Sequence, residues 1–199
     1  MSGQEIKDGS GSQRLAFVDE ENRLLTRAVS QPNIGHHSLH DGKAFSAYMR
    51  HTFAAADTDE DIAFFYLPTT TTNKVVISQL TVVTTGTASK LEVFFQPTGR
   101  TGGDLVTMLG LNLTSSVISS AIAYHKNPTA FSFTHVAANE FIDIRVGTGQ
   151  PSFTFSLNDA LILGPGDALG FVGESSGIGD KMRINCYYYE INAFGNLGE

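Results

Sequence analysis

The sequence contains no tryptophan, a single cysteine and no long apolar segment. Cys186 has no partner for a disulfide within the chain, which leans weakly toward assembly inside a cell. No apolar segment approaches the roughly 20 residues that a membrane helix needs, so we expect no membrane partner. The first residues lack the apolar core of a signal peptide. Without tryptophan, carbohydrate binding has no positive support in the sequence.

Charged residues are also scarce, at 17% of the 199 residues, and the net charge is −7. An acidic chain repels phosphate groups, which argues against a nucleic-acid partner. The length suffices for one domain with a sizeable core. Low charge together with abundant glycine, threonine and phenylalanine favours an all-β fold.

The clearest local pattern lies between Pro151 and Ile191. Phe153, Phe155 and Leu157 alternate with polar residues, as in a half-buried strand. The segment Gly164-Pro165-Gly166-Asp167 predicts a turn, because proline fixes φ and glycine accepts positive φ. The same period of two predicts three further buried faces, namely Phe45/Met49/Phe53, Leu91/Val93/Phe95 and Met182/Ile184/Cys186. We therefore predict an all-β, antiparallel, jelly-roll-like β-sandwich over residues 41–199.

Residues 1–40 differ from this body and are predicted to form an extended N-terminal arm. Residues 1–12 are polar and glycine-rich, which predicts an extended tail. Residues 14–29 carry a sparse amphipathic pattern that suits either a short helix or a strand. The segment Ser115–Ala123 in the body is similarly ambiguous.

One motif suggests catalysis but lacks the required context. Gly173-Glu174-Ser175-Ser176-Gly177 matches the G-x-S-x-G nucleophile elbow. That elbow needs a strand before it and a helix after it, whereas a second strand follows here. We interpret the motif as a loop and expect no enzyme activity.

Two clusters could bind metal. Asp57, Asp59 and Asp61 imitate the start of a calcium loop, but the required glycine and glutamate would fall at Ile62 and Pro68, which excludes an EF-hand. A loose calcium site and a solvated acidic loop both stay open, and the second is favoured. His36, His37 and His40 could likewise supply zinc ligands, although docking onto a neighbouring chain is the favoured interpretation. His51 lies on an apolar strand face and is interpreted as a hydrogen-bonded core histidine. We expect no cofactor and no resident metal.

Four features stand in a familiar order along the chain. The first is residues 17–24 (FVDEENRL), and the second is residues 36–45 (HHSLHDGKAF). The third combines Gly102-Gly103-Asp104 with residues 111–116 (LNLTSS). The fourth is residues 161–169 (LILGPGDAL), which are followed later by Tyr188-Tyr189-Glu190. In this order the chain resembles accessory virion proteins of tailed bacteriophages, in particular capsid decoration (cement) proteins. The likeness covers most of residues 17–190.

The resemblance implies a jelly roll that trimerises on the outer capsid surface of the virion, after assembly in the host cytoplasm, and that has no enzyme activity. Its partners would be the major capsid protein and neighbouring copies of itself. We expect the arm to make these contacts through Leu15, Phe17, Val18, Arg23, Leu24, Leu25, His36, His37 and His40. Tyr187 and Tyr189 share the face of the last strand opposite the core, so we expect them at the trimer interface.

Two other functions compete with capsid decoration. The chain could be a tail-tip or receptor-binding module of the same particle, which would be present in few copies where a decoration protein is present in many. It could also be a hydrolase on a sandwich scaffold, but no set of acid, base and nucleophile supports this.

Overall fold

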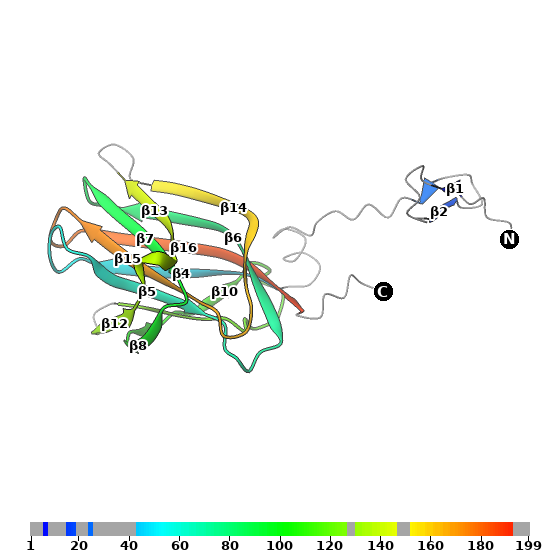
Figure 1. Ribbon diagram of the computed structural model, residues 1–199, viewed down its shortest axis with the longest axis horizontal. Helices are drawn as coiled ribbons and strands as arrows, with labels where there is room; N and C mark the ends of the chain where they lie inside the picture. The colour runs from blue at the N-terminus through cyan, green and yellow to red at the C-terminus, as the bar shows by residue number, and fades with distance from the viewer. Residues whose placement is uncertain are drawn as a thin grey trace. The chain divides into compact units, whose positions relative to one another are not determined.

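The computed structural model describes residues 43–126, 130–146 and 152–192, together with three short strands nearer the N-terminus (Figure 1). The chain divides into two compact units, Met1–Pro32 and Asn33–Glu199. The predicted boundary after residue 40 lies outside the described residues.

The N-terminal unit contains a small antiparallel sheet of order β1-β2-β3. Its strands are β1 (Ile6–Lys7), β2 (Leu15–Val18) and β3 (Leu24–Leu25). The amphipathic segment therefore forms strands, one of its two predicted alternatives. Within the predicted extended tail, Ile6 and Lys7 are in a strand and pair with Ala16 and Leu15 of β2.

The body is all-β, and its described residues contain no α-helix. The first sheet has the order β10-β4-β16-β6-β14. Its strands are β4 (Ala44–Thr52), β6 (Asn73–Thr84), β10 (Met108–Gly110), β14 (Ser152–Leu163) and β16 (Lys181–Asn192). Two of the predicted alternating faces, Phe45/Met49/Phe53 and Met182/Ile184/Cys186, thus come from paired strands of this antiparallel sheet or the residue directly after one.

The second sheet has six strands in the order β13-β7-β15-β5-β11-β9. Its strands are β5 (Glu60–Tyr66), β7 (Ser89–Phe95), β9 (Asp104–Leu105), β11 (Ile122–His125), β13 (Glu140–Val146) and β15 (Ala168–Ser175). The ambiguous segment Ser115–Ala123 forms no helix; most of it is irregular, and its last two residues begin β11.

A third layer covers part of the second sheet. It consists of β8 (Thr98–Gly102) paired with β12 (Phe131–Thr134), and the 3₁₀ turn η2 (Ala137–Asn139) follows it. Phe131 and Phe133 pack there against Phe64, Phe94 and Val172 in a second apolar cluster. Gly170 permits this approach, because a Cβ at that position would lie 2.5 Å from Cε2 of Phe133.

Eight long strands form the two facing sheets: β4, β5, β6, β7, β13, β14, β15 and β16 (Figure 1). In space their order is β4-β16-β6-β14 in one sheet and β13-β7-β15-β5 in the other. When the eight strands are counted along the chain, these orders read first-eighth-third-sixth and fifth-fourth-seventh-second. The chain changes sheet at every connection between them except that from β7 to β13. Neighbouring strands are therefore far apart in sequence, and all pairings are antiparallel.

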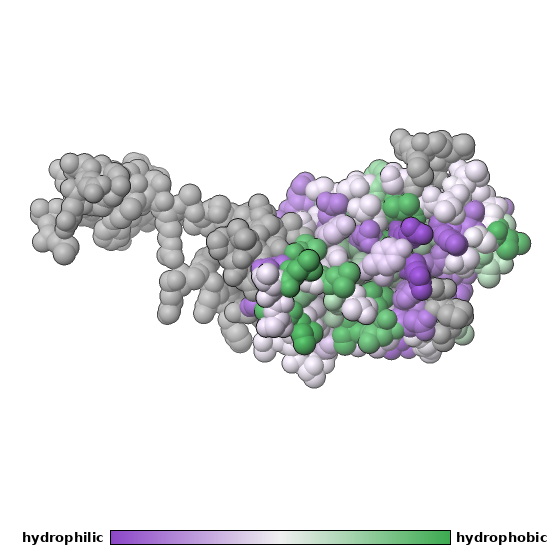
Figure 2. All heavy atoms as spheres, turned by 180° about the vertical axis from the view of Figure 1, so that it is seen from behind, coloured by the Kyte–Doolittle hydropathy of each residue, from purple (hydrophilic) through white to green (hydrophobic). Residues whose placement is uncertain are grey.

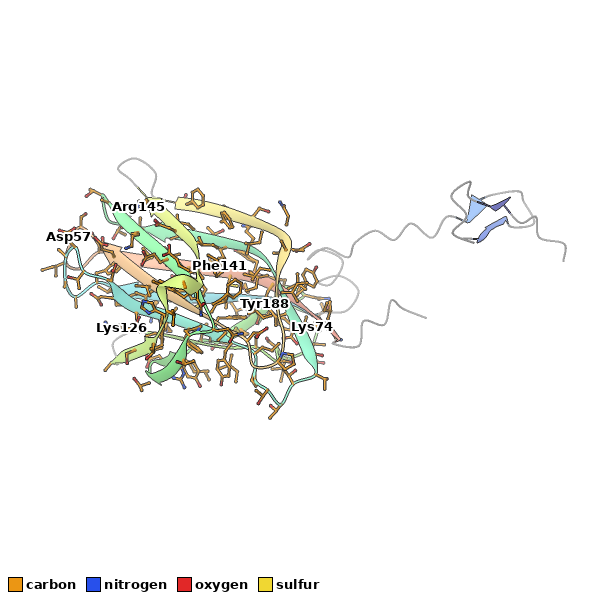
Figure 3. All side chains as sticks on the ribbon, viewed as in Figure 1. Asp57, Lys74, Lys126, Phe141, Arg145 and Tyr188 are labelled. Atoms are coloured by element: carbon orange, nitrogen blue, oxygen red, sulfur yellow. The ribbon has the colours of Figure 1, made fainter. Side chains whose placement is uncertain are left out.

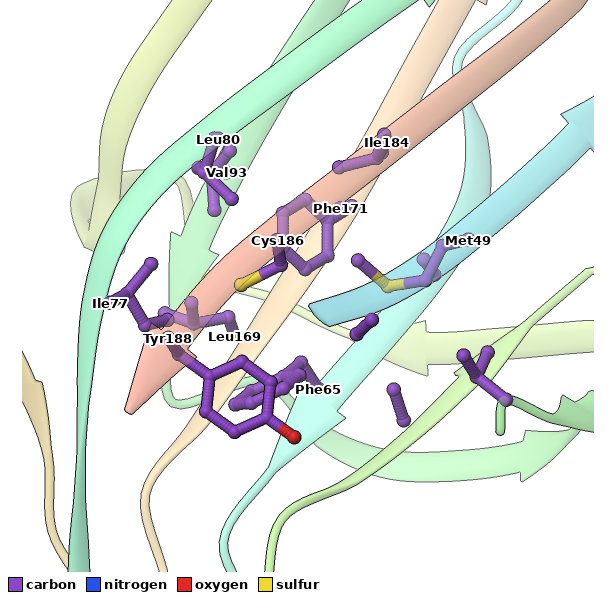
Figure 4. Packing of buried hydrophobic residues seen from close by; sticks show 14 of the residues in the cluster. Met49, Phe65, Ile77, Leu80, Val93, Leu169, Phe171, Ile184, Cys186 and Tyr188 are labelled. Carbon is purple, nitrogen blue, oxygen red and sulfur yellow. The ribbon is translucent and has the colours of Figure 1, made fainter. Parts of the chain in front are cut away.

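The main core lies between the two sheets, which confirms the predicted β-sandwich. Phe45, Phe65 and Phe171 are buried there with Tyr188, whose ring lies 5.2 Å from the Phe65 ring, centre to centre. Figure 4 shows Cys186 among these side chains. Burial raises the pKa of the Cys186 thiol, so the lone cysteine is an apolar core residue.

The predicted faces Phe45/Met49/Phe53 and Met182/Ile184/Cys186 are buried as expected. Leu91 and Val93 are buried, whereas Phe95 is half-buried against Phe141.

The prediction that Phe153, Phe155 and Leu157 are core residues is wrong. Phe153 is 37% exposed, and the other two side chains are only half-buried. They lie on β14, the edge strand of its sheet; Phe153 and Phe155 precede a shift in its register with β6, and Leu157 lies within that shift. Full burial on β14 begins only after that shift, at Leu161 and Leu163.

The predicted turn at Gly164-Pro165-Gly166-Asp167 is confirmed. The Asp167 amide donates to the Gly164 carbonyl at 3.0 Å. Gly166 has φ +93°, a conformation that a side chain would strain. The Asp167 carboxylate closes the turn by accepting from the Gly164 amide at 2.7 Å.

Candidate binding surfaces

Ser175, at the centre of the nucleophile-like motif, is buried and hydrogen-bonded. Its Oγ donates to Oδ2 of Asp180 at 2.7 Å and lies 3.3 Å from Oγ of Ser89. Thr84 continues this network through its own contact with Ser89 at 2.8 Å. A turn follows β15 where an elbow would need a helix. None of the partners of Ser175 in the described part of the chain is a histidine, which a triad would require.

The acidic segment at the start of β5 sends its carboxylates to different partners. Asp59 pairs with Lys90 at 3.3 Å, whereas Asp61 accepts from the Phe133 amide at 3.0 Å. Burial raises the pKa of Asp61 above its ordinary value, against that opposing hydrogen bond. Across residues 43–126, 130–146 and 152–192, no group of three or more His, Cys, Asp or Glu side chains could hold a metal ion. His36, His37 and His40 lie outside these ranges, as does Arg23 of the arm.

His51 is a buried, hydrogen-bonded core histidine, as predicted. Its Nδ1 lies 3.0 Å from the Lys126 carbonyl and its Nε2 lies 3.0 Å from Oε2 of Glu60. Both partners are acceptors, so only the protonated ring donates to both. Burial lowers the pKa of His51, while the Lys126 carbonyl and the Glu60 charge act in the opposite direction.

A second buried carboxylate, Glu190, fixes the base of a long loop that runs across one edge of the sandwich. Its Oε1 accepts from Oγ of Ser119 at 2.8 Å and from the Ser120 amide at 2.6 Å. Its Oε2 accepts from the amide group of Asn73 at 3.0 Å. Ser119 also lies 2.7 Å from the hydroxyl of Tyr188, whose ring is in the core (Figures 3 and 4). The loop is thereby tied to the strand that carries Tyr188 and Glu190.

The same loop is fixed at its other end. The Leu111 amide donates to the Ala44 carbonyl at 2.8 Å, and Oδ1 of Asn112 accepts from both the amide and the hydroxyl of Thr114. The Asn112-Leu113-Thr114 segment is therefore a tight local turn that points Leu113 outward.

Most of the exposed large apolar side chains of the described residues lie on this loop and the short strands before it. Leu113 is 95% exposed and Ile118 is 88% exposed. Six of the eleven such side chains fall within residues 105–118, a set that we name the apolar edge: Leu105, Leu109, Leu111, Leu113, Val117 and Ile118. Strongly hydrophobic side chains gather in a group on the face shown in Figure 2. Concentrated exposure of this kind marks an interaction surface.

The opposite edge of the sandwich carries a groove of about 370 Å³ between β13 and β14, with aromatic and aliphatic walls and a charged rim. We name it the edge groove; it is lined by Phe141, Ile142, Asp143, Ile144, Arg145, Phe153 and Phe155. Ile142 and Ile144 are buried, whereas Arg145 at the rim is 78% exposed and pairs with Asp143 at 3.5 Å. Figure 3 marks Phe141 and Arg145 on β13.

The outer face of the five-stranded sheet carries a cationic strip formed by Arg50, Lys181 and Arg183. Arg50 and Arg183 are direct cross-strand partners in the pairing of β4 with β16. Like charges at such positions repel each other. With Tyr48 these side chains line a hollow of about 210 Å³, and none of the three is in an ion pair with a residue of the described ranges. An anionic partner would relieve this repulsion.

Tyr187 and Tyr189 lie on the face of β16 opposite the main core, as the alternation predicted. Tyr187 is half-buried, but Tyr189 is only 5% exposed and packs with Ala44 and Val76. Burial, followed by the charge of Asp159, raises the pKa of Tyr189 to about 12. Within a single chain, Tyr189 therefore has little surface left for a partner.

Comparison of the chain with protein-family models, with curated proteins and with solved structures finds no match. No helix of the described residues is long and apolar enough to cross a membrane.

The sequence alone did not indicate any of the three surfaces, because each brings together residues whose neighbours are set by the strand order. The apolar edge is visible in the sequence as Leu-rich residues 105–118, but their exposure depends on where β9, β10 and the anchored loop lie in the fold. The cationic strip joins Arg50 to residues more than a hundred positions later. Only the strand order brings such residues together.

Proposed function

We propose that this chain is a structural protein of a tailed-phage particle, which decorates and stabilises the capsid as a homotrimer. In this proposal the N-terminal arm contacts the major capsid protein, and the β-sandwich contacts neighbouring copies. The protein would act on the outer surface of the virion, after assembly in the host cytoplasm, without enzyme activity and without a cofactor.

The apolar edge carries the proposal. A folded domain that holds Leu113 and Ile118 almost fully exposed on an anchored loop is built to associate, since the loop is ordered before any partner binds. The cationic strip adds a second surface, which suits an acidic patch on a neighbouring protein. Both are features of a binding or assembly protein.

The strand order supports the jelly-roll part of the proposal. The order first-eighth-third-sixth in one sheet and fifth-fourth-seventh-second in the other is the order expected for two Greek keys packed as a jelly roll. We therefore infer a jelly roll. Jelly rolls are found in viral shells and in unrelated proteins, so the fold alone assigns no function.

The test is binding of the full-length chain to capsids that lack it, with sedimentation to separate bound from free protein. We expect saturable binding at many copies per particle, and no further binding to particles that already carry the protein. Saturation at a few copies per particle would instead favour the tail-tip module. No binding at all would contradict capsid decoration.

A further inference from the structure

The apolar edge and the edge groove lie at opposite ends of the two sheets. Strands β9 and β10, which only residues 106 and 107 separate in the sequence, are the last strands of their two sheets at one end of the sandwich. Strands β14 and β13 are the last strands at the other end. A rigid sandwich cannot bring both of its own edges together, so the apolar edge of one copy cannot enter the edge groove of the same copy.

The two edges are chemically matched. The apolar edge presents aliphatic side chains, with Leu113 and Ile118 protruding from the anchored loop. The edge groove presents aromatic walls at Phe141, Phe153 and Phe155, and its 370 Å³ lies in the range of about 300–1,000 Å³ that is usual for ligand sites. A small ligand in the groove would leave the protruding side chains unexplained.

The strand that borders the groove also needs a cover. β14 has twelve residues, stands at the edge of its sheet and contains one charged residue, Asp159. Long edge strands with few charges invite pairing with another chain unless something covers them. The groove side of the sandwich therefore favours a protein occupant.

We propose that the occupant is a second copy of this chain, whose apolar edge inserts Leu113 and Ile118 into the edge groove. Such an interface is head-to-tail, because two different surfaces meet, and repetition of it closes a ring or extends a filament. The proposed homotrimer is the closed case with three copies. The inference rests on the self-association in the proposed function and is independent of capsid binding.

The experiment uses three full-length variants and native mass spectrometry. The edge variant is Leu113→Asp with Ile118→Asp, the groove variant is Phe153→Asp, and the control is Ile178→Asp. All these side chains are exposed, so the fold should tolerate the changes, and Ile178 lies on the turn after β15, away from both surfaces. Circular dichroism checks that each variant is folded.

We expect the wild type and the control to have the same mass, a multiple of the 21.4 kDa of one chain. The edge variant and the groove variant should each fall to the mass of one chain. Mixed in equal amounts, they retain one intact edge and one intact groove between them, so they should form a dimer and nothing larger. An interface of two identical surfaces would not give this result.

Two outcomes would overturn the inference, and they differ in what they imply. If the wild type is an oligomer and both variants keep its mass, or if the mixture stays monomeric, this interface is wrong while self-association stands. If the wild type has the mass of one chain even at high concentration, self-association itself fails, although capsid binding stays open to its own test.

Discussion

At the scale of single residues, Glu60 is the most heavily hydrogen-bonded carboxylate in the described core. Its Oε2 lies 2.7 Å from the ammonium of Lys126 and 3.0 Å from Nε2 of His51. Its Oε1 accepts from the amides of Ala54 and Ala55 at 3.0 and 3.3 Å. This carboxylate joins the start of β5, the end of β4 and the residue that follows β11.

The surroundings of Glu60 determine how its charge affects stability. Burial acts to raise the pKa of Glu60, but the hydrogen bonds from Lys126 and Ala54 and the nearby positive charges outweigh it, so the pKa is lowered below the ordinary 4.5. A carboxyl group with a lowered pKa in the folded state stabilises the protein above its unfolded-state pKa. That contribution is lost as pH falls from about 4.5 through the folded-state pKa.

We predict that Glu60→Gln lowers the free energy of unfolding by on the order of 3 kcal/mol at pH 7, because it leaves Lys126 and His51 without their anion. The difference from the wild type should shrink as pH falls below 4.5, because the unfolded wild-type chain takes up a proton at Glu60 before the folded state does. Denaturant unfolding at several pH values measures both effects.

The matched control is Glu174→Gln, which removes a more exposed carboxylate 3.7 Å from Lys90. Exposed ion pairs contribute about 0–1 kcal/mol, so this variant should stay close to the wild type at every pH. The prediction would be contradicted if both variants lost the same free energy of unfolding. It would also be contradicted if the difference between Glu60→Gln and the wild type did not change with pH.

The sequence alone indicated that His51 is a buried, hydrogen-bonded histidine, but it did not indicate that Glu60 is its partner. The alternation of β4 places His51 among buried neighbours, and a buried imidazole needs partners. Glu60 stands in the acidic segment 57–61, which is typical of a solvated loop, yet it is the first residue of β5. Its partner Lys126 is 66 positions away, and no local pattern indicates such a contact.

At the scale of elements, the third layer formed by β8 and β12 depends on two phenylalanines. The ring of Phe133 lies 5.8 Å from those of Phe64 and Phe131, and its amide donates to Asp61. The rest of the contact between β12 and the sheet is limited, since Ser132 and Thr134 face outward. The layer should therefore detach when the aromatic packing is lost.

We predict that Phe133→Ala lowers the free energy of unfolding by about 3 kcal/mol, the lower end of the range for buried Phe→Ala changes, because β12 covers the sheet from outside. Hydrogen exchange should accelerate at residues 98–102 and 131–134 before it does at β4 or β16. Thermal or denaturant unfolding measures the change in the free energy of unfolding, and hydrogen-exchange mass spectrometry shows which residues are destabilised.

Ser132→Ala is the control for this layer. Its hydroxyl lies 2.8 Å from that of Thr101 on the exposed side, so its loss should cost less than about 1 kcal/mol. Exchange that accelerates uniformly in Phe133→Ala would show that the layer is part of one cooperative unit with the sandwich, against our expectation.

Strands were predictable as elements, but their environments were not. Phe131 and Phe133 alternate as in any half-buried strand, and nothing local indicates that they cover a sheet from outside. Phe153 and Phe155 alternate equally well, but the edge position of β14 leaves them partly exposed. Burial depends on neighbours that the alternation of one strand does not identify.

At the scale of the whole molecule, composition and alternation were enough to predict two facing sheets, because half-buried strands must cover each other. The strand order was not predictable in this way. β4 pairs with β16 and β7 with β15, and each pair joins distant parts of the chain. The candidate surfaces depend on that order, which is why the sequence indicated their residues only in part.

The two units of the chain lead to the last prediction, which concerns the arm. Every residue of the main described core lies between Phe45 and Tyr188, and contacts cluster separately in Met1–Pro32 and in the rest. Deletion of residues 1–32 should therefore change the stability of the sandwich by less than about 1 kcal/mol, which corresponds to a shift in Tm of less than about 4 °C.

Binding to capsids should weaken strongly, and a peptide of residues 1–40 should compete with the full-length chain. Thermal melts followed by circular dichroism and co-sedimentation with capsids measure the two effects separately. If the truncated chain is folded and still decorates capsids with unchanged affinity, the arm does not carry the contact, and the sandwich surfaces must do so instead.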